Sequence, residues 1–263
     1  MKNIFSGKFK HYRRVFCVIA LAALAVFAAC NRHDGNSGLY LGDPSADGRR
    51  INSVPANNLE AAFNYVNENP GTYTLLIDRN VNTGGLTLNS ASELTITGTG
   101  GMRTVQYEGS IFNPLLTLNN GDATLVLGEG ITLRGIQNGR DVLVSVLSGH
   151  LVMREGAVIT GHRTYLGVGV VCINGSRSFF TMEGGEITGN YSEDDNEFAS
   201  GGVFVQLNST FIMTGGSITG NMRANLDHPL MDVVIHGLTA IRNSSYHGGV
   251  IDYVIPVDWT SVD

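Results

Sequence analysis

Carboxylate side chains are the residues of this sequence whose spacing could do chemistry. The densest group is one acidic run, and carboxylate oxygens are the ligands that calcium prefers, about six to eight per ion. Its acidic members are Glu193, Asp194, Asp195 and Glu197. The run lacks the alternating spacing and the glycine of an EF-hand loop. We therefore expect a solvated loop, with a calcium-binding or ligand-binding loop as the alternative.

Another group of carboxylates is the pair Glu183 and Glu186. It is of the type that glycoside hydrolases use as acid and base. The chain contains an internal repeat, and the equivalent positions in its next copy are Thr214 and Ser217. No acidic cluster therefore recurs on neighbouring copies. We expect isolated surface carboxylates and no catalytic residues, so an enzyme is the less favoured interpretation.

Histidine and cysteine residues show no pattern that is typical of metal binding. Five histidines in the second half of the chain follow no ligand-type spacing: His150, His162, His228, His236 and His247. Cys172 is the last of three cysteines. It shares a strand register with Val170, so we expect a buried, weakly polar side chain and not a nucleophile. The sequence predicts neither a metal site nor a cofactor.

The first thirty residues form a predicted export signal. Basic residues precede an apolar run of 15 residues, Val15–Ala29, which is shorter than the roughly 20 residues that span a membrane. The run ends in Phe27-Ala28-Ala29-Cys30, which resembles the lipobox of bacterial lipoproteins. The resemblance implies that Cys30 receives diacylglycerol and becomes the new N-terminus, and that Asn31 directs the protein to the outer membrane. An ordinary signal peptide with an incidental cysteine is the alternative.

The composition of the remaining chain limits its partners and its means of stabilisation. Residues 1–30 contain five of the 17 basic residues and none of the 23 acidic ones, so the rest carries a net charge of −11. Such a chain repels nucleic acid. Its single cysteine, Cys172, excludes an internal disulfide. The 34 glycines and 6 prolines indicate many tight turns.

The strongest pattern is the internal repeat. Residues 180–190 read FTMEGGEITGN and recur as FIMTGGSITGN at 211–221, an offset of 31. Each copy predicts three short strands with inward-facing residues at alternate positions. The first strands carry Leu116/Leu118, Val144/Val146, Val170/Cys172 and Val203/Val205; the second Leu125/Leu127, Leu151/Met153, Phe180/Met182 and Phe211/Met213; the third Leu133, Ile159, Ile187 and Ile218. Stacking of such units into parallel coils buries these side chains.

This repeat resembles the right-handed parallel β-helix of the pectin-lyase-like superfold over residues 72–221. More narrowly, residues 201–221 are similar to the Gly-Gly-Val-Phe-Val…Phe-Ile-Met-Thr-Gly-Gly-Ser-Ile-Thr-Gly-Asn repeat of bacterial surface proteins. The fold class is therefore expected to be all-β; a propeller or sandwich is the weaker alternative. Asn190 and Asn221 occupy one repeat position, which predicts a structural asparagine stack. The preceding copy has His162 there, so we expect the stack to end at that coil.

The segments outside the repeat are expected to tether and cap the solenoid. Residues 31–55 are polar and glycine-containing, which predicts a flexible tether. A short helix after Asn58 is expected to cap the N-terminal end of a domain that spans residues 56–263. The segment Val250–Trp259 is expected to cap the other end. Insertions at 191–200 and between Asn221 and Met231 follow the same strand, so they should project from one flank, the first choice for a binding surface.

These observations predict a lipid-anchored cell-envelope protein, most simply of the outer membrane, that acts through its surface. By analogy with similar surface proteins, its partner is expected to be a glycan or another protein. A polysaccharide lyase or glycoside hydrolase on the same superfold is the first alternative, and a purely structural envelope component is the second. Fold alone does not decide among them.

Overall fold

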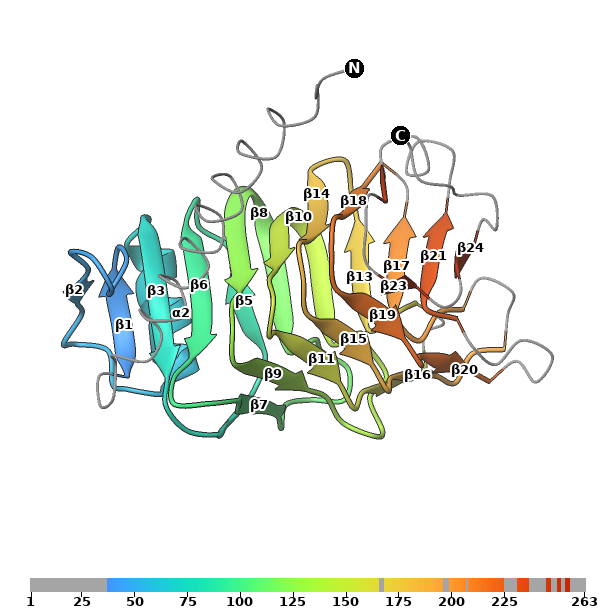
Figure 1. Cartoon of the computed structure of the whole chain (residues 1–263), viewed down its shortest axis with the longest axis horizontal. Coiled ribbons are helices and arrows are strands. Elements are labelled where there is room, and N and C mark those ends of the chain that lie inside the picture. The colour runs from blue at the N-terminus through green and yellow to red at the C-terminus, as the bar shows by residue number, and fades with distance from the viewer. Residues whose placement is uncertain are drawn as a thin grey trace, which may run out of the picture. The chain divides into compact units, whose positions relative to one another are not determined.

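The computed structural model describes residues 37–165, 168–195, 199–206, 208–224, 231–236, 245–246, 250–251 and 254–255. From Ser37 onward the chain forms one unit. Its parallel strands stack coil upon coil into a β-solenoid (Figure 1). The predicted all-β parallel β-helix is therefore confirmed.

Three columns of strands run along the solenoid. The first contains β5 (Leu86–Leu88), the start of β8 (Leu116–Leu127), the start of β10 (Val144–Met153), β13 (Val171–Asn174), β17 (Val203–Gln206), β21 (Val233–His236) and β24 (Val254–Ile255). The second contains β3 (Thr72–Ile77), β6 (Glu93–Gly98), the ends of β8 and β10, β14 (Ser178–Met182), β18 (Thr210–Met213) and β22 (Ser245–Tyr246). The third contains β4 (Val81–Thr83), β7 (Arg103–Tyr107), β9 (Ile131–Arg134), β11 (Val158–Thr160), β15 (Glu186–Thr188), β19 (Ser217–Thr219) and β23 (Val250–Ile251).

The register between coils follows the sequence repeat. Phe180 pairs with Phe211, and Ile187 pairs with Ile218. All four side chains are fully buried, and the two phenylalanine rings stack with centroids 5.2 Å apart. One repeat of 31 residues is thus one coil, and its apolar residues form ladders along the interior.

One predicted register is wrong. Val144 and Val146 pair with Val171 and Ile173, which take the inward strand positions expected for Val170 and Cys172. Val170 precedes β13 and is also buried in the main core. Cys172 instead packs against a second apolar cluster, separate from the interior, made of Phe204, Met231 and Val234. The four consecutive apolar residues from 170 to 173 contain two possible alternations. Pairing with the neighbouring coil selects one of them, and a slip of one residue exchanges the two faces of a strand.

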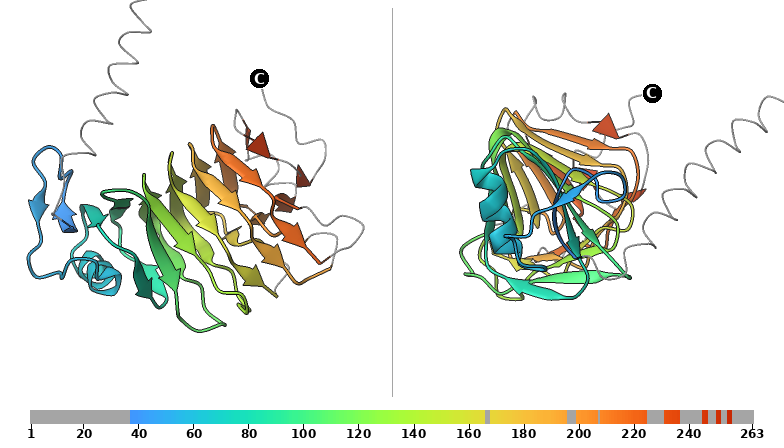
Figure 2. Two further views of the ribbon diagram at one scale, coloured as in Figure 1. Left: turned by 60° about the horizontal axis from the view of Figure 1, so that its bottom comes forward. Right: turned by 90° about the vertical axis from the view of Figure 1, so that its left-hand side faces the viewer.

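The helix α2 (Leu59–Glu68) begins as expected. The side chain of Asn58 accepts a hydrogen bond from the backbone N–H of Ala61 at 2.9 Å, which satisfies a free donor of the first turn. Leu59, Ala62, Phe63 and Val66 join the main core. The helix lies beside the first coils in the view along the solenoid (Figure 2). No helix in the described residues is long and apolar enough to cross a membrane.

The described part of the expected tether, residues 37–55, is folded. β1 (Gly38–Leu41) pairs antiparallel with β3 and with the short strand β2 (Arg49–Arg50). Leu39, Ile51 and Val54 are buried in the main core. The exposed edge of a sheet carries unpaired backbone N–H and C=O groups, which any paired strand satisfies. A mostly polar segment can therefore cover the edge. Residues 31–36 lie outside the described residues.

Glycines at one turn allow the coils to stack closely. Between the second and third columns, Gly130, Gly156, Gly185 and Gly216 have φ angles of 74°, 76°, 84° and 86°. A Cβ atom on Gly185 would lie 2.5 Å from the carbonyl oxygen of Ala157 in the preceding coil. Both the positive φ and the close approach require glycine there. This explains the second glycine of the Gly-Gly pair in the repeat.

Candidate functional site

The loops after the third column lie side by side, and we call their described residues within 108–115, 135–143, 161–170, 189–202 and 220–232 the loop flank. Short parallel strands connect three of them: β12 (Arg163–Thr164), β16 (Tyr191–Ser192) and β20 (Met222–Arg223). Backbone bonds connect the others, including Arg140 N–H to the Ile111 carbonyl at 2.6 Å. The described parts of both insertions therefore project from one flank, as expected.

Asn190 and Asn221 are bonded to each other in the first turn of these loops. The Asn190 amide nitrogen Nδ2 donates to Oδ1 of Asn221 at 2.9 Å, and Nδ2 of Asn221 donates to the Ile187 carbonyl at 2.8 Å. Both side chains are buried. Their groups are used by neighbouring coils, which supports a structural role.

The stack extends beyond the two asparagines in both directions. His162, the expected end, donates its backbone N–H to Oδ1 of Asn190 at 3.1 Å and binds the preceding loop through its ring. At the other end, Oδ1 of Asp232 accepts hydrogen bonds from Nδ2 and from the backbone N–H of Asn221, at 2.8 and 3.0 Å. The expectation that the stack ends at His162 was wrong, because Nδ1 of its ring accepts from the backbone N–H of Ile136, as Oδ1 of each asparagine accepts from the coil before it.

The imidazole of His162 fills a slot in the loop 135–143. A Cβ atom on Gly135 or Gly139 would lie 2.3 or 2.5 Å from atoms of this side chain. Nδ1 accepts from the backbone N–H of Ile136 at 3.3 Å, and Nε2 lies 2.8 Å from the Asp141 carbonyl oxygen, to which it donates. Burial lowers the pKa of His162, partly offset by the bond to Asp141 and its charge. The ring is therefore neutral, with its proton on Nε2.

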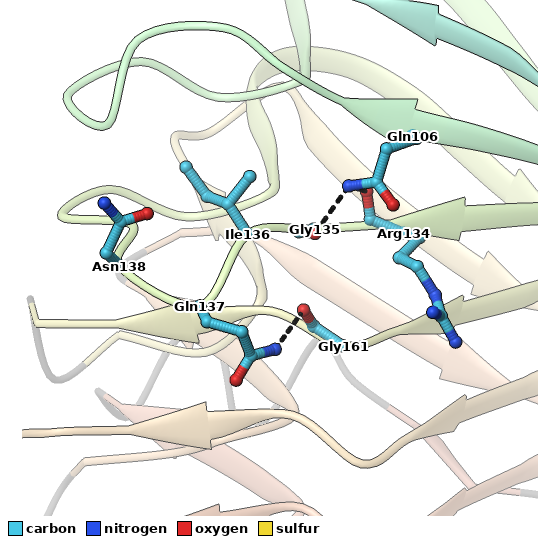
Figure 3. A pocket seen from close by; sticks show the side chains of 7 residues that line it. All are labelled: Gln106, Arg134, Gly135, Ile136, Gln137, Asn138 and Gly161. Carbon is cyan, nitrogen blue, oxygen red and sulfur yellow. Dashed lines mark hydrogen bonds between the residues drawn. The ribbon is translucent and has the colours of Figure 1, made fainter.

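A hollow of about 470 Å³ lies beside this loop (Figure 3). Its lining consists of Gln106, Arg134, Gly135, Ile136, Gln137, Asn138 and Gly161. Gln106 and Gln137 donate from their amide nitrogens to the carbonyls of Gly135 and Gly161, at 2.9 and 2.8 Å. These bonds fix both side chains and leave their Oε1 atoms as acceptors. The guanidinium of Arg134 adds exposed donors.

An aromatic–arginine row, which we define as Phe112, Arg140, Tyr165, Arg163 and Tyr191, crosses successive loops of the flank. The guanidinium carbon of Arg140 lies 5.8 Å from the ring centre of Phe112 and 5.7 Å from that of Tyr165. These two rings are 62% and 50% exposed. Arg163 lies over Tyr191 at 4.8 Å. Cation–π contacts of this length hold the side chains together while the rings stay open to solvent. Sequence reasoning missed this row because its members come from four different loops and have no shared motif.

The acidic loop does not converge on a metal position in the described residues. Glu193 forms an ion pair with Nε of Arg163, and the backbone N–H of Asp194 donates to the Ser192 hydroxyl. Asp195 is exposed, and Glu197 lies outside the described residues. No group of three His, Cys, Asp or Glu side chains in the described part of the chain is placed to hold a metal ion. Glu193 therefore contacts the aromatic–arginine row through Arg163.

The other candidates from the sequence are engaged elsewhere. Glu183 pairs with Arg154 at 3.4 Å, while Glu186 lines a separate groove of about 410 Å³. Nε2 of His150 lies 2.8 Å from the Thr181 hydroxyl, and burial lowers the pKa of this histidine. Burial raises the pKa of the Cys172 thiol to about 12, so the thiol stays protonated and is a poor nucleophile.

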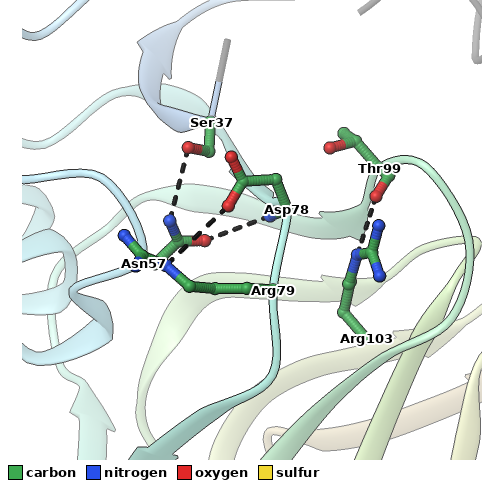
Figure 4. A network of polar contacts seen from close by, with 6 residues as sticks. All are labelled: Ser37, Asn57, Asp78, Arg79, Thr99 and Arg103. Carbon is green, nitrogen blue, oxygen red and sulfur yellow. Dashed lines mark hydrogen bonds and ion pairs between the residues drawn. The ribbon is translucent and has the colours of Figure 1, made fainter. Parts of the chain in front are cut away.

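A second polar network lies at the N-terminal end (Figure 4). Asn57 has a φ angle of 59°; its side chain donates to the Ser37 hydroxyl at 3.3 Å and accepts from the Asp78 backbone N–H at 3.0 Å. A hydrogen bond from Ser37 is the main cause that lowers the pKa of Asp78, followed by the opposing effect of burial and then by Asn57. These groups bond to one another and fasten the N-terminal segment to the first coil, so we assign them a structural role.

No protein-family model, no curated protein and no solved structure matches this chain. The loop flank combines exposed rings, exposed guanidinium and amide groups and a hollow.

Proposed function

We propose that this chain is a lipid-anchored protein of the bacterial cell envelope that binds a glycan through its loop flank. The observation that carries the binding proposal is the position of Arg140 between the exposed rings of Phe112 and Tyr165. The anchor proposal rests on the lipobox-like residues that end at Cys30, and the outer membrane follows from Asn31.

The chemistry of the flank suits a sugar chain. Aromatic ring faces pack against the C–H faces of sugar rings, which are apolar, while hydroxyl groups around each sugar need donors and acceptors. Phe112 and Tyr165 offer such faces. Gln106, Gln137 and Arg134 offer acceptors and donors in the adjoining hollow. Neighbouring coils are about 4.8 Å apart, so the row presents its groups in steps along the axis, as a linear ligand requires.

A protein partner is less favoured by the same surface. A specific protein interface buries roughly 800 Å² on each partner around a largely apolar centre. On the described flank the exposed rings are separated by a guanidinium, and the hollow is lined mainly by amides and backbone. Amide side chains combined with a few aromatic faces are better matched to hydroxyl-rich ligands.

The test is a glycan array probed with the chain from residue 31 onward. We expect binding to at least one glycan class, and a loss of at least about tenfold in affinity in the double variant Phe112→Ala/Tyr165→Ala, on the scale of about 1 kcal/mol per aromatic contact. Phe179→Ala is the matched control, because Phe179 is also exposed but lies on β14. Absence of binding, or equal loss in the control, would refute the proposal. Release of unsaturated or reducing ends from a polysaccharide would instead indicate an enzyme.

The anchor is tested separately with Cys30→Ser. Without the thiol that carries the lipid, the protein should leave the membrane fraction and appear in the soluble envelope fraction. Metabolic labelling with a fatty acid should mark the unchanged chain and not the variant. Continued membrane fractionation of the variant would refute lipidation.

A further inference from the structure

The loop that carries Arg140 is held on both sides of this residue by a single side chain. Before Arg140, the backbone N–H of Ile136 donates to Nδ1 of His162; after it, the carbonyl of Asp141 accepts from Nε2. Both bonds use the imidazole of the next coil, which is 2% exposed. The position of Arg140 in the row thus depends on this ring together with the bond from its own backbone N–H to the Ile111 carbonyl.

These two bonds require the neutral imidazole. A protonated ring carries N–H groups on both nitrogens, so Nδ1 would face the N–H of Ile136 as donor against donor. The ring has little room to turn away, because the backbones of Gly135 and Gly139 lie against it where side chains would otherwise clash. Burial also excludes the water that would relieve an unpaired donor. Protonation therefore opposes the closed loop.

The charged groups around His162 do not remove this conflict. Asp141 is the ionisable group that raises its affinity for a proton, but the carboxylate already accepts from the backbone N–H of Val142. Arg163, the next residue, is paired with Glu193. On the other side the neighbour in the stack is Asn190, which does not titrate, and Asp232 is separated from His162 by both asparagines. Burial lowers the pKa of His162, consistent with the neutral form in the folded protein.

We infer that His162 is a positioning residue that acts as a pH-sensitive latch on the loop 135–143. In the neutral form it helps to hold Arg140 between Phe112 and Tyr165. In the protonated form the bond to Ile136 is lost, so the loop opens more often and the row loses its fixed geometry. Only the biological purpose of the latch rests on the proposed function: in an acidic environment it would let the loop flank release its glycan. The closing and opening of the loop do not require a ligand.

The test is hydrogen exchange of residues 135–142, measured by mass spectrometry on the chain from residue 31 onward without any glycan. Rates are divided by the intrinsic rate at each pH. We expect about fivefold faster exchange at about pH 5 than at about pH 7.5, the factor that corresponds to the loss of one hydrogen bond. Residues 180–188, in the second and third columns, should stay equally protected, which distinguishes loop release from unfolding.

Two histidine variants make the result specific. His162→Asn places at this position the residue that occupies it in the next two coils, so the stack is kept while the titrating group is removed; its pH response should fall below about twofold. His150→Gln removes a half-buried histidine that also has a lowered pKa, and this variant should keep the fivefold response. Gly139→Ala, whose Cβ would lie 2.5 Å from Cε1 of His162, should open the loop at both pH values.

An unchanged exchange rate between the two pH values in the natural protein would overturn the latch. An equal pH response in His162→Asn would overturn it as well. Because the glycan array tests binding and hydrogen exchange tests the loop, the failure of one proposal is distinguishable from the failure of the other.

Discussion

The buried polar stack predicts a large effect of one substitution, Asn221→Leu. Leucine is the nearest apolar side chain in shape to asparagine, so the change removes hydrogen bonds without opening a cavity. Asn221 is fully buried, and four of its side-chain bonds are to Asn190 Nδ2, the Ile187 carbonyl, the Thr219 carbonyl and Asp232, at 2.9, 2.8, 3.3 and 2.8 Å. Each net bond stabilises by about 1 kcal/mol, and a buried group left unpaired costs about 1 to 3 kcal/mol.

Two of the lost partners decide the magnitude. Asn190 keeps other acceptors, the carbonyls of Ile159 and Thr188, so its amide is not left without bonds. The Ile187 carbonyl and the Asp232 carboxylate each lose a short bond inside the protein. We therefore expect the free energy of unfolding to fall by about 3 to 4 kcal/mol, which would lower the midpoint of urea denaturation by about 1 to 2 M at ordinary slopes.

The assay is urea denaturation followed by circular dichroism, on the chain from residue 31 onward. Asn138→Leu is the control, because Asn138 lies on the same flank but is exposed; it should change the free energy by about 0.5 kcal/mol or less. An Asn221→Leu loss no larger than that of the control would refute the argument, since the stack would then contribute nothing beyond local loop structure.

The core, the turns and the histidines each yield one further prediction. Ile187→Asp should abolish the cooperative transition, because it places an unpaired charge in a fully buried position; unchanged melting would contradict the inward register. Gly185→Ala should destabilise the fold by about 1 to 3 kcal/mol in denaturation, given its φ angle of 84° and its contact with the Ala157 carbonyl; an effect below about 0.5 kcal/mol would contradict the close stacking. His150 and His162 both have a lowered pKa in the folded state, so the folded protein favours their neutral forms. The resulting stability is complete above about pH 6.5 and is lost as the pH falls through the pKa values of the folded state. The melting temperature should therefore fall less across that pH range in the double variant His150→Gln/His162→Asn than in the natural protein.

The second and third columns could be predicted from the sequence because two constraints agree there. The alternation of Phe180 and Met182 fixes which face is buried, and the recurrence of the same residues 31 positions later fixes the coil. A wrong assignment of the buried face or of the coil would have to conflict with both patterns. The glycine turn adds a third constraint, because a positive φ at Gly185 and Gly216 recurs at the same offset.

The first column was harder where apolar residues run together. Val170, Val171, Cys172 and Ile173 permit either face to be buried, and only the pairing of β13 with β10 and β17 resolves this. The prediction of a flexible tether for the N-terminal segment failed for a different reason. The segment is held by backbone pairing of β1 with β3 and by the burial of Leu39, Ile51 and Val54, and neither produces an apolar periodicity in the sequence. Almost every residue can form backbone hydrogen bonds, so the composition of a segment does not indicate whether it forms them.

The loop flank combines the most regular and the most variable parts of the repeat, and this combination explains how it can bear a site. Asn190 and Asn221 fix the first residue of each loop through bonds that do not depend on the length or composition of the loop itself. Loops that start from a fixed point can differ in length without disturbing the coils. Because His162 continues the same stack into the preceding loop, that loop inherits the register of the asparagines. Arg140 is therefore positioned by the solenoid, although neither its own loop nor the rings of Phe112 and Tyr165 follow the repeat.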